Sequence, residues 1–251
     1  MKRVAKFLFL SSMSVCILGL LTILFSYFFL KPSLPEISLV DESYLQMPLK
    51  IYTEDGVLIG EFGEIKRRPI PFKDIPEDLR NAFIAAEDSN FFNHQGISYK
   101  GLIRSFVRCI SVDGCSGGGG TITMQVVRGY LLSRDKTISR KVKEIFLALE
   151  LESTLSKEEI FELYVNRIFL GNRSYGIEAA ANTYFNKSVN NLSLSESATI
   201  ASMAQLPSKI NPIKNPSRTK IRRNWILYRM NDLGLISNLD YEESISEKIK
   251  T

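Results

Sequence analysis

From residue 74 onward, hydrophobic residues recur every three to four positions along much of the chain, which is the spacing of amphipathic helices. The first such helix carries its apolar face on Leu79, Ala82, Phe83 and Ala86. We expect Asp74 to cap this helix, with Pro76 in its first turn. The helix then delivers residue 87 at its C-terminal end.

The same spacing predicts further helices over residues 157–169, 176–185, 193–206 and about 217–233. Ser193 and Glu196 form a capping-box pattern at the start of the third of these. Ahead of the helical part, the runs 49–52 and 57–62 resemble strands and flank Asp55-Gly56, a dipeptide typical of hairpin turns. The pattern therefore predicts a mainly α fold with a small β element.

Two of the predicted helices carry a polar stripe beside an apolar one. The helix that follows the glycines 117–120 has its polar stripe on Thr121, Gln125 and Arg128, and its core-facing residues are Ile122, Val126 and Val127. The next helix has its apolar stripe on Ile138, Val142, Ile145 and Leu149. That stripe leaves Lys141 and Glu144 on a different face.

The N-terminal region predicts a membrane anchor. Residues 7–30 contain no charged side chain, and at 1.5 Å per residue they span about 36 Å, enough to cross a bilayer. A cleaved signal peptide is the competing interpretation, but its apolar core is usually only roughly 7–15 residues long. Lys2, Arg3 and Lys6 precede the stretch, so the positive-inside rule puts the N-terminus in the cytoplasm and the main domain outside.

This pattern divides the chain into four parts. We expect a cytoplasmic tip and transmembrane anchor over 1–31, a linker over 32–48, the main domain over 49–236 and a C-terminal tail over 237–251.

Composition changes this picture in two respects. The formal net charge is +5 and the pI is near 9.0, and on an extracytoplasmic domain this favours anionic lipid headgroups and pyrophosphates over nucleic acid as partners. Cys109 and Cys115 are close enough in sequence for a local disulfide, which the sequence leaves open. No zinc site is expected, because a second cysteine pair is missing and the single histidine lies elsewhere.

Adjacent carboxylates mark the end of the first predicted helix. Glu87 and Asp88 are followed by the chain's only histidine, His94, and by Gly96. Such a group suits acid–base chemistry. Taken alone, the segment equally fits a solvated helix end with a histidine packed in a turn.

Two later segments have the same ambiguity. The glycines 117–120 fit a flexible loop, or a backbone that approaches an anion at a helix N-terminus. Arg140 and Lys141 with Glu144 fit an anion-binding group, or simple ion pairing on a wet helix face.

In combination and in this order, the segments resemble the motifs of the peptidoglycan glycosyltransferases of glycosyltransferase family 51. That family includes the polymerase module of class A penicillin-binding proteins and single-domain relatives, and the resemblance covers about residues 49–236. The matching segments are Glu87-Asp88 with Phe91, His94 and Gly96; Thr121-Ile122-Thr123 with Gln125; Arg140-Lys141 with Glu144; 157–164, 166–171, Tyr175-Gly176-Ile177 and 179–187; and 194–207.

Several positions depart from the family pattern. Gly120 stands where the family usually has Ser, Met124 replaces a Gln, Arg128 a Lys, Gly129 an Asn and Ser98 an Asp. None of these changes removes a carboxylate. We expect the two glycines to loosen the helix that should hold phosphate, since a glycine in a helix interior costs up to roughly 1 kcal/mol relative to Ala.

The resemblance implies a lysozyme-like domain of two lobes, anchored in the bacterial cytoplasmic (inner) membrane by a single helix. It implies polymerisation of lipid II, the undecaprenyl-pyrophosphate disaccharide-pentapeptide, into β-1,4 glycan strands. An in-line displacement of the α-linked pyrophosphate inverts the donor sugar. Implied partners are lipid II, the growing glycan chain and the membrane, with other cell-wall synthesis proteins possible and no nucleic acid.

The resemblance also implies roles for individual residues. Glu87 would be the catalytic base, and Glu144 would be the second catalytic carboxylate, which organises the basic residues or holds a divalent ion such as Mg²⁺ or Mn²⁺. No ligand set in the sequence specifies that ion, so no cofactor is assigned. The substrate-binding residues would be Asp88, Phe91, His94, Thr121, Gln125, Arg128, Arg140 and Lys141.

Two other functions stay open on the sequence. One is a lytic transglycosylase or lysozyme-type hydrolase, which cleaves glycan with a pair of carboxylates. The other is a non-catalytic membrane protein that binds lipid II without turnover.

Overall fold

The structure, a computed structural model, describes residues 13–14, 17–19, 21–22, 25–37, 49–56, 58–62, 66–103, 120–132 and 137–251. Within these residues, no helix is both long and apolar enough to cross a bilayer. The predicted anchor over 7–30 lies partly outside the described residues. The possible Cys109–Cys115 disulfide and the glycines 117–119 lie wholly outside them.

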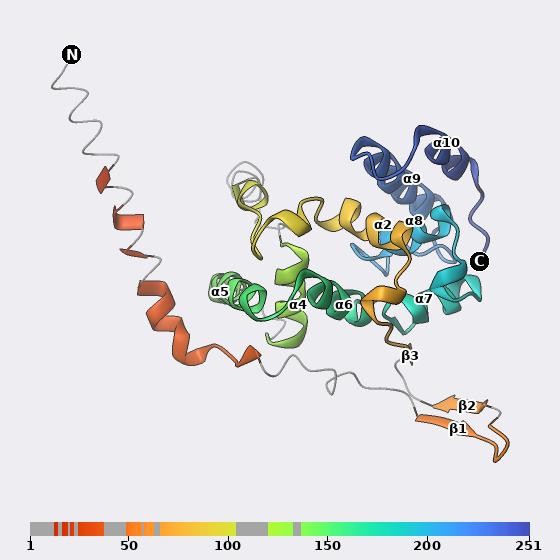
Figure 1. Cartoon of the computed structure of the whole chain (residues 1–251), viewed down its shortest axis with the longest axis horizontal. Helices are drawn as coiled ribbons and strands as arrows, with labels where there is room; N and C mark the ends of the chain where they lie inside the picture. Colours follow the sequence, from red (N-terminus) through yellow and green to blue (C-terminus); the bar gives the residue numbers. More distant parts are fainter. Residues whose placement is uncertain are drawn as a thin grey trace.

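The described domain is mainly α-helical, as predicted (Figure 1). Its α-helices are α2 Glu77–Glu87, α4 Ile122–Tyr130, α5 Ile138–Thr154, α6 Lys157–Arg167, α7 Ile177–Phe185, α8 Leu194–Met203, α9 Pro216–Asp232 and α10 Asn238–Ser246. Short 3₁₀ turns are η1 Lys31–Ser33, η4 Phe72–Asp74, η5 Phe91–Asn93 and η6 Val189–Asn191. The strands are β1 Leu49–Tyr52, β2 Leu58–Phe62, β3 Lys66–Arg67 and β4 Ser174–Tyr175.

The helices form two groups that meet near the end of α2 (Figure 1). Helix α4 packs against α5 and α6, while α2 packs against α8 and α9, and α9 also carries α10. The C-terminal end of α2 reaches the first turn of α4, where the backbone N–H of Ile122 donates to Asp88. The two groups are therefore joined at the predicted site.

Helix α2 has the predicted apolar face but a different start. Leu79, Ala82 and Phe83 are completely buried, which confirms the face. Asp74 does not cap the helix, because it ends the η4 turn and the N-cap is Pro76, whose extended ψ of 143° delays the first helical residue to Glu77. The prediction therefore placed the helix start too early.

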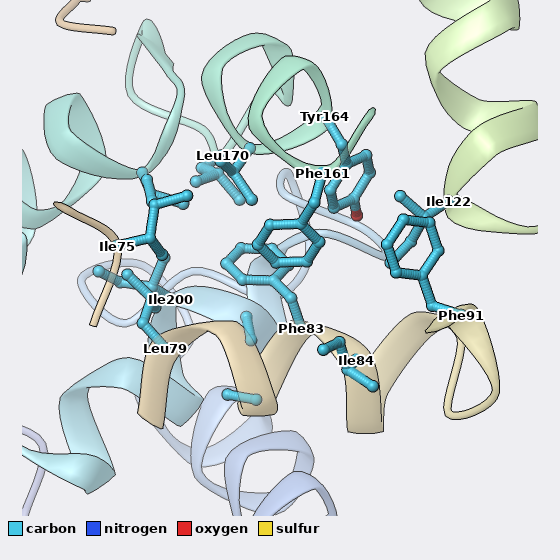
Figure 2. Packing of buried hydrophobic residues seen from close by; sticks show 14 of the residues in the cluster. Ile75, Leu79, Phe83, Ile84, Phe91, Ile122, Phe161, Tyr164, Leu170 and Ile200 are labelled. Atoms are coloured by element: carbon cyan, nitrogen blue, oxygen red, sulfur yellow. The ribbon is translucent and has the colours of Figure 1, made fainter. Parts of the chain in front are cut away.

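Aromatic side chains from three elements pack beneath the site (Figure 2). Phe83 of α2 meets Tyr164 of α6 edge-on, with ring centroids 5.9 Å apart, and Phe91 of η5 lies 6.0 Å from Phe161 of α6. Such pairs contribute roughly 0.5–1.5 kcal/mol each beyond their buried area. They fix the end of α2 and the η5 turn against α6.

The core-facing side of α5 differs from the prediction. The buried residues are Glu144, Leu147, Ala148 and Leu151, whereas Leu149 of the predicted stripe is 40% exposed. A second apolar face explains the error, because Phe146 packs edge-on against Tyr27 of the N-terminal segment at 5.2 Å. The sequence pattern cannot tell which of two apolar faces meets the core.

The small β element confirms the predicted hairpin. Strands β1 and β2 pair antiparallel, and the turn is closed by Gly56 N–H donating to Thr53 O at 3.0 Å, with Gly56 at a φ of +85°. The parallel pair β3–β4 was not predicted. Each of those strands has only two residues, too few for a period of two to be recognised.

Residues 237–251, expected as a tail, contain a helix that packs on the domain. Ser237 caps α10 in a capping box with Asp240. The completely buried Arg223 of α9 donates to the carbonyls of Ile245 and Glu247. The segment after residue 236 is thus held on α9, and the predicted domain boundary stays a prediction.

Candidate active site

Asp88 connects the three elements that form the site. It follows the last residue of α2, and its Oδ2 accepts hydrogen bonds from His94 Nε2 at 2.8 Å and from Ile122 N–H at 3.2 Å. Asp88 is 8% exposed and His94 is 9% exposed. The two residues predicted beside the base thus lie together and fix the geometry of the helix end.

Phe91 belongs to the core beneath this turn. It has no exposed surface, and the Nζ of Lys157 lies 4.5 Å from the centre of its ring. Phe91 was predicted to bind substrate, and that role stays a prediction. Its position indicates that it supports the loop from below.

Glu87 is the last residue of α2 and is half-buried. Its Oε2 accepts a hydrogen bond of 3.0 Å from Nε2 of Gln125 on α4. Gln125 was expected to bind pyrophosphate, and in the structure it donates to the candidate base. Arg128, one turn further along α4, is exposed.

Thr121 is the N-cap of α4. Its hydroxyl accepts from Met124 N–H at 3.1 Å and donates to Gly96 O at 2.6 Å. The φ of Gly96 is +78°, and a Cβ there would lie 2.6 Å from the carbonyl oxygen of Ala148, so only glycine fits. The hydroxyl expected to bind pyrophosphate is thus already used to tie α4 to the loop after Asp88.

The basic residues of α5 surround a buried carboxylate. Glu144 is 1% exposed, and its two oxygens pair with the guanidinium of Arg140 and with Lys141 Nζ, the latter at 3.1 Å. This burial rules out simple pairing on a wet helix face. The same buried carboxylate therefore holds Arg140 and Lys141 side by side.

Gly120 lies beside this basic group. It precedes the N-cap Thr121, so the helix-interior cost expected for this glycine does not apply. A Cβ at position 120 would lie 3.7 Å from Lys141 Nζ, which is an ordinary contact distance. The end of the glycine run thus comes close to the cations of α5.

A serine at position 120 should therefore be accommodated. We expect Gly120→Ser to leave the activity that the resemblance implies, glycan polymerisation, unchanged or to raise it, because the new hydroxyl would lie near Lys141. The measurement is the initial rate of polymerisation with a stability check by thermal unfolding. Gly96→Ser is the matched control and should unfold at lower temperature; a large loss of activity in Gly120→Ser would show that the glycine is needed there.

Gly129, the second glycine that departs from the family pattern, is in contact with Arg167. A Cβ there would lie 3.0 Å from Arg167 Nε, and the Arg167 guanidinium donates to the Gly129 carbonyl and stacks over the Tyr130 ring at 4.2 Å. The contacts of Arg167 offset the loosening that a mid-helix glycine causes.

Two further groups near Glu87 were missed. Tyr164 lies inside a recognised motif but received no role, and its buried hydroxyl has no partner among the described residues. Arg222 of α9 stacks over Trp225 at 4.0 Å. Burial lowers the pKa of Arg222, and the negative charge of Glu87 opposes that shift. Arg222 is one of five basic residues of α9, and in sequence such a density of charge looks like a solvated helix.

The residues at the site do not fit a protein-held divalent cation. Both oxygens of Glu144 are paired with cations, and Oδ2 of Asp88 already accepts two hydrogen bonds. In the part of the chain that the structure describes, no group of three His, Cys, Asp or Glu side chains could hold a metal ion.

Comparisons with known proteins identify the family. A family profile described as Transglycosylase matches residues 55–231. The chain is 47% identical to penicillin-binding protein 1A of Pseudomonas aeruginosa over 98% of its length and 30% of that protein, and 41% identical to penicillin-binding protein 1A of Escherichia coli over 99% of its length and 29% of that protein.

A solved structure is also similar, the crystal structure of penicillin-binding protein 1A from Haemophilus influenzae. The identity is 35% and the TM-score 0.49, over 82% of this chain and 21% of that one. The chain spans about a third of the length of the relatives named here. The chain therefore belongs to the transglycosylase family.

Proposed function

We propose that this chain polymerises lipid II into β-1,4 glycan strands and releases undecaprenyl pyrophosphate, with inversion at the donor sugar. One observation carries the proposal. Glu87, held by Gln125, ends one helix, while a buried Glu144 fixes two cations on another helix. A base and an anion-binding group are thus kept on separate elements of one domain.

The reaction needs both parts. Glu87 takes the proton from the 4-hydroxyl of the incoming sugar, whose oxygen forms a bond to C1 of the donor. The bond between C1 and the pyrophosphate oxygen breaks, and Arg140 and Lys141 stabilise the negative charge on the departing pyrophosphate. Attack opposite the leaving group converts the α-linkage into a β-linkage.

The same arrangement disfavours glycan hydrolysis. A retaining or inverting glycosidase uses two carboxyl groups that flank the bond to be cleaved. Glu144 is 1% exposed and both of its oxygens are paired with cations. It is therefore poorly suited to be the second carboxyl group of a hydrolase.

We also propose that the domain is lysozyme-like with two lobes, and that it faces away from the cytoplasm on a single anchor over residues 7–30. The uncharged stretch and Lys2, Arg3 and Lys6 before it support this topology. Protease added outside spheroplasts should degrade the domain after residue 31. Its protection there would refute the topology.

Lipid II carrying a fluorescent label tests the activity directly. The purified chain should convert it into products of increasing length, which gel electrophoresis separates, and lysozyme should digest those products. Short glycan fragments released from preformed strands, with no growth from lipid II, would indicate a hydrolase. Tight lipid II binding without any polymer would indicate the non-catalytic alternative.

A further inference from the structure

Tyr164 has a hydroxyl that the core does not explain. The residue is 4% exposed, and its hydroxyl oxygen has no hydrogen-bond partner within the described part of the chain. The ring packs between α6 and α2, edge-on to Phe83. Figure 2 shows the oxygen on the side of the ring toward Ile122 and Phe91, where α4 begins and η5 follows α2.

An apolar residue would fill this position at lower cost. A buried hydroxyl without a partner loses its hydrogen bonds to water and gains nothing in return. Phenylalanine would keep the packing against Phe83 and avoid that loss. A buried polar group that the fold leaves unpaired therefore calls for a functional explanation.

The surroundings of the hydroxyl are those of the proposed reaction. Burial raises the pKa of Tyr164 well above its usual value, the charges of Glu87 and Asp88 raise it further, and Arg128 opposes them. Glu87 and Asp88 come from the end of α2 and Arg128 from α4, and Arg222 of α9 is the further cation that acts on Glu87. The hydroxyl keeps its proton at working pH, so it can donate.

We propose that Tyr164 is a positioning residue for the base: its hydroxyl donates a hydrogen bond to the Glu87 carboxylate in the substrate-loaded site. Holding one oxygen leaves the other free for the proton of the sugar 4-hydroxyl. In the structure Gln125 donates to Glu87 Oε2, and we infer that the tyrosine holds the carboxylate when Gln125 contacts the substrate. This inference rests on the proposed function.

The variant Tyr164→Phe tests it. We expect kcat for lipid II polymerisation to fall about 10-fold to 100-fold, the loss of one hydrogen bond to a charged group, with KM changed less than about twofold. The acid limb of the kcat–pH profile should move to higher pH, because the carboxylate loses a donor that stabilises its charged form. The melting temperature should stay constant or rise.

Tyr184→Phe is the matched control, since Tyr184 is also buried but its hydroxyl donates to Leu170 O and accepts from Asn211. It should lower the melting temperature and leave the kcat–pH profile in place. Unchanged kcat in Tyr164→Phe, or a loss that is uniform across pH, would overturn the inference. Absence of polymer from the unmodified chain would instead refute the proposed function, and the inference with it.

Discussion

Glu87→Gln should abolish glycan polymerisation while leaving the fold and lipid II binding nearly intact. The amide has the shape of the carboxylate, and its oxygen can still accept the 3.0 Å hydrogen bond from Gln125. It cannot take the proton of the sugar 4-hydroxyl. A positioned general base typically contributes about 10²- to 10⁴-fold to a rate, so we expect a loss of that size in kcat.

Three measurements on this variant separate chemistry from structure: chain growth from labelled lipid II, lipid II affinity, and thermal unfolding. Glu158→Gln is the matched control, because Glu158 is exposed in the first turn of α6. It should behave like the unmodified chain in all three. Substantial polymerisation by Glu87→Gln would show that Glu87 is not the catalytic base. Glu144 would then be the next candidate for that role.

Local signals in the sequence predicted much of the fold. The apolar face of α2, the capping box of Ser193 and Glu196 and the hairpin turn at Gly56 are all present. Each depends on residues that are close together in the chain, so the physical cause is contained in the segment itself. The succession of helices along the chain was predicted for the same reason, because each helix has its own apolar spacing.

Tertiary packing decided what the sequence could not predict. On α5 two apolar faces compete, and the packing of Phe146 against Tyr27 shows that one of them is covered by a distant segment. Phe91 reads as a motif residue, but its burial depends on Phe161 and Lys157 of α6. The residues next to Phe146 and Phe91 in the sequence do not indicate which distant side chains will pack against them.

The candidate site likewise has some features that the sequence predicts and others that depend on tertiary packing. The adjacency of Glu87 and Asp88 and the spacing of Arg140, Lys141 and Glu144 are visible in the sequence. Their hydrogen-bond partners are not, because Gln125 could hold a phosphate or a carboxylate equally well by its chemistry. Tyr164 and Arg222 reach the site only through the packing of α6 and α9, so a sequence pattern gives them no role.

Glu144→Gln should impair substrate binding as well as turnover, unlike Glu87→Gln. Glu144 is buried, and its charge is what holds Arg140 and Lys141 side by side. The amide can accept from one cation only weakly, so the two positive groups repel each other and turn toward solvent. We expect KM for lipid II to rise about 10-fold or more, since a charge-assisted hydrogen bond contributes about 1.5–3 kcal/mol.

Stability should fall as well, by about 1–3 kcal/mol, because the amide leaves the buried end of the ion-pair group incompletely bonded. Glu150→Gln on the exposed side of α5 is the matched control and should change neither property. The measurements are lipid II affinity, chain growth and chemical denaturation on both variants. If Glu144→Gln bound lipid II normally and lost only turnover, Glu144 would act in the chemical step rather than in binding the pyrophosphate, and the roles of the two glutamates would have to be reassigned.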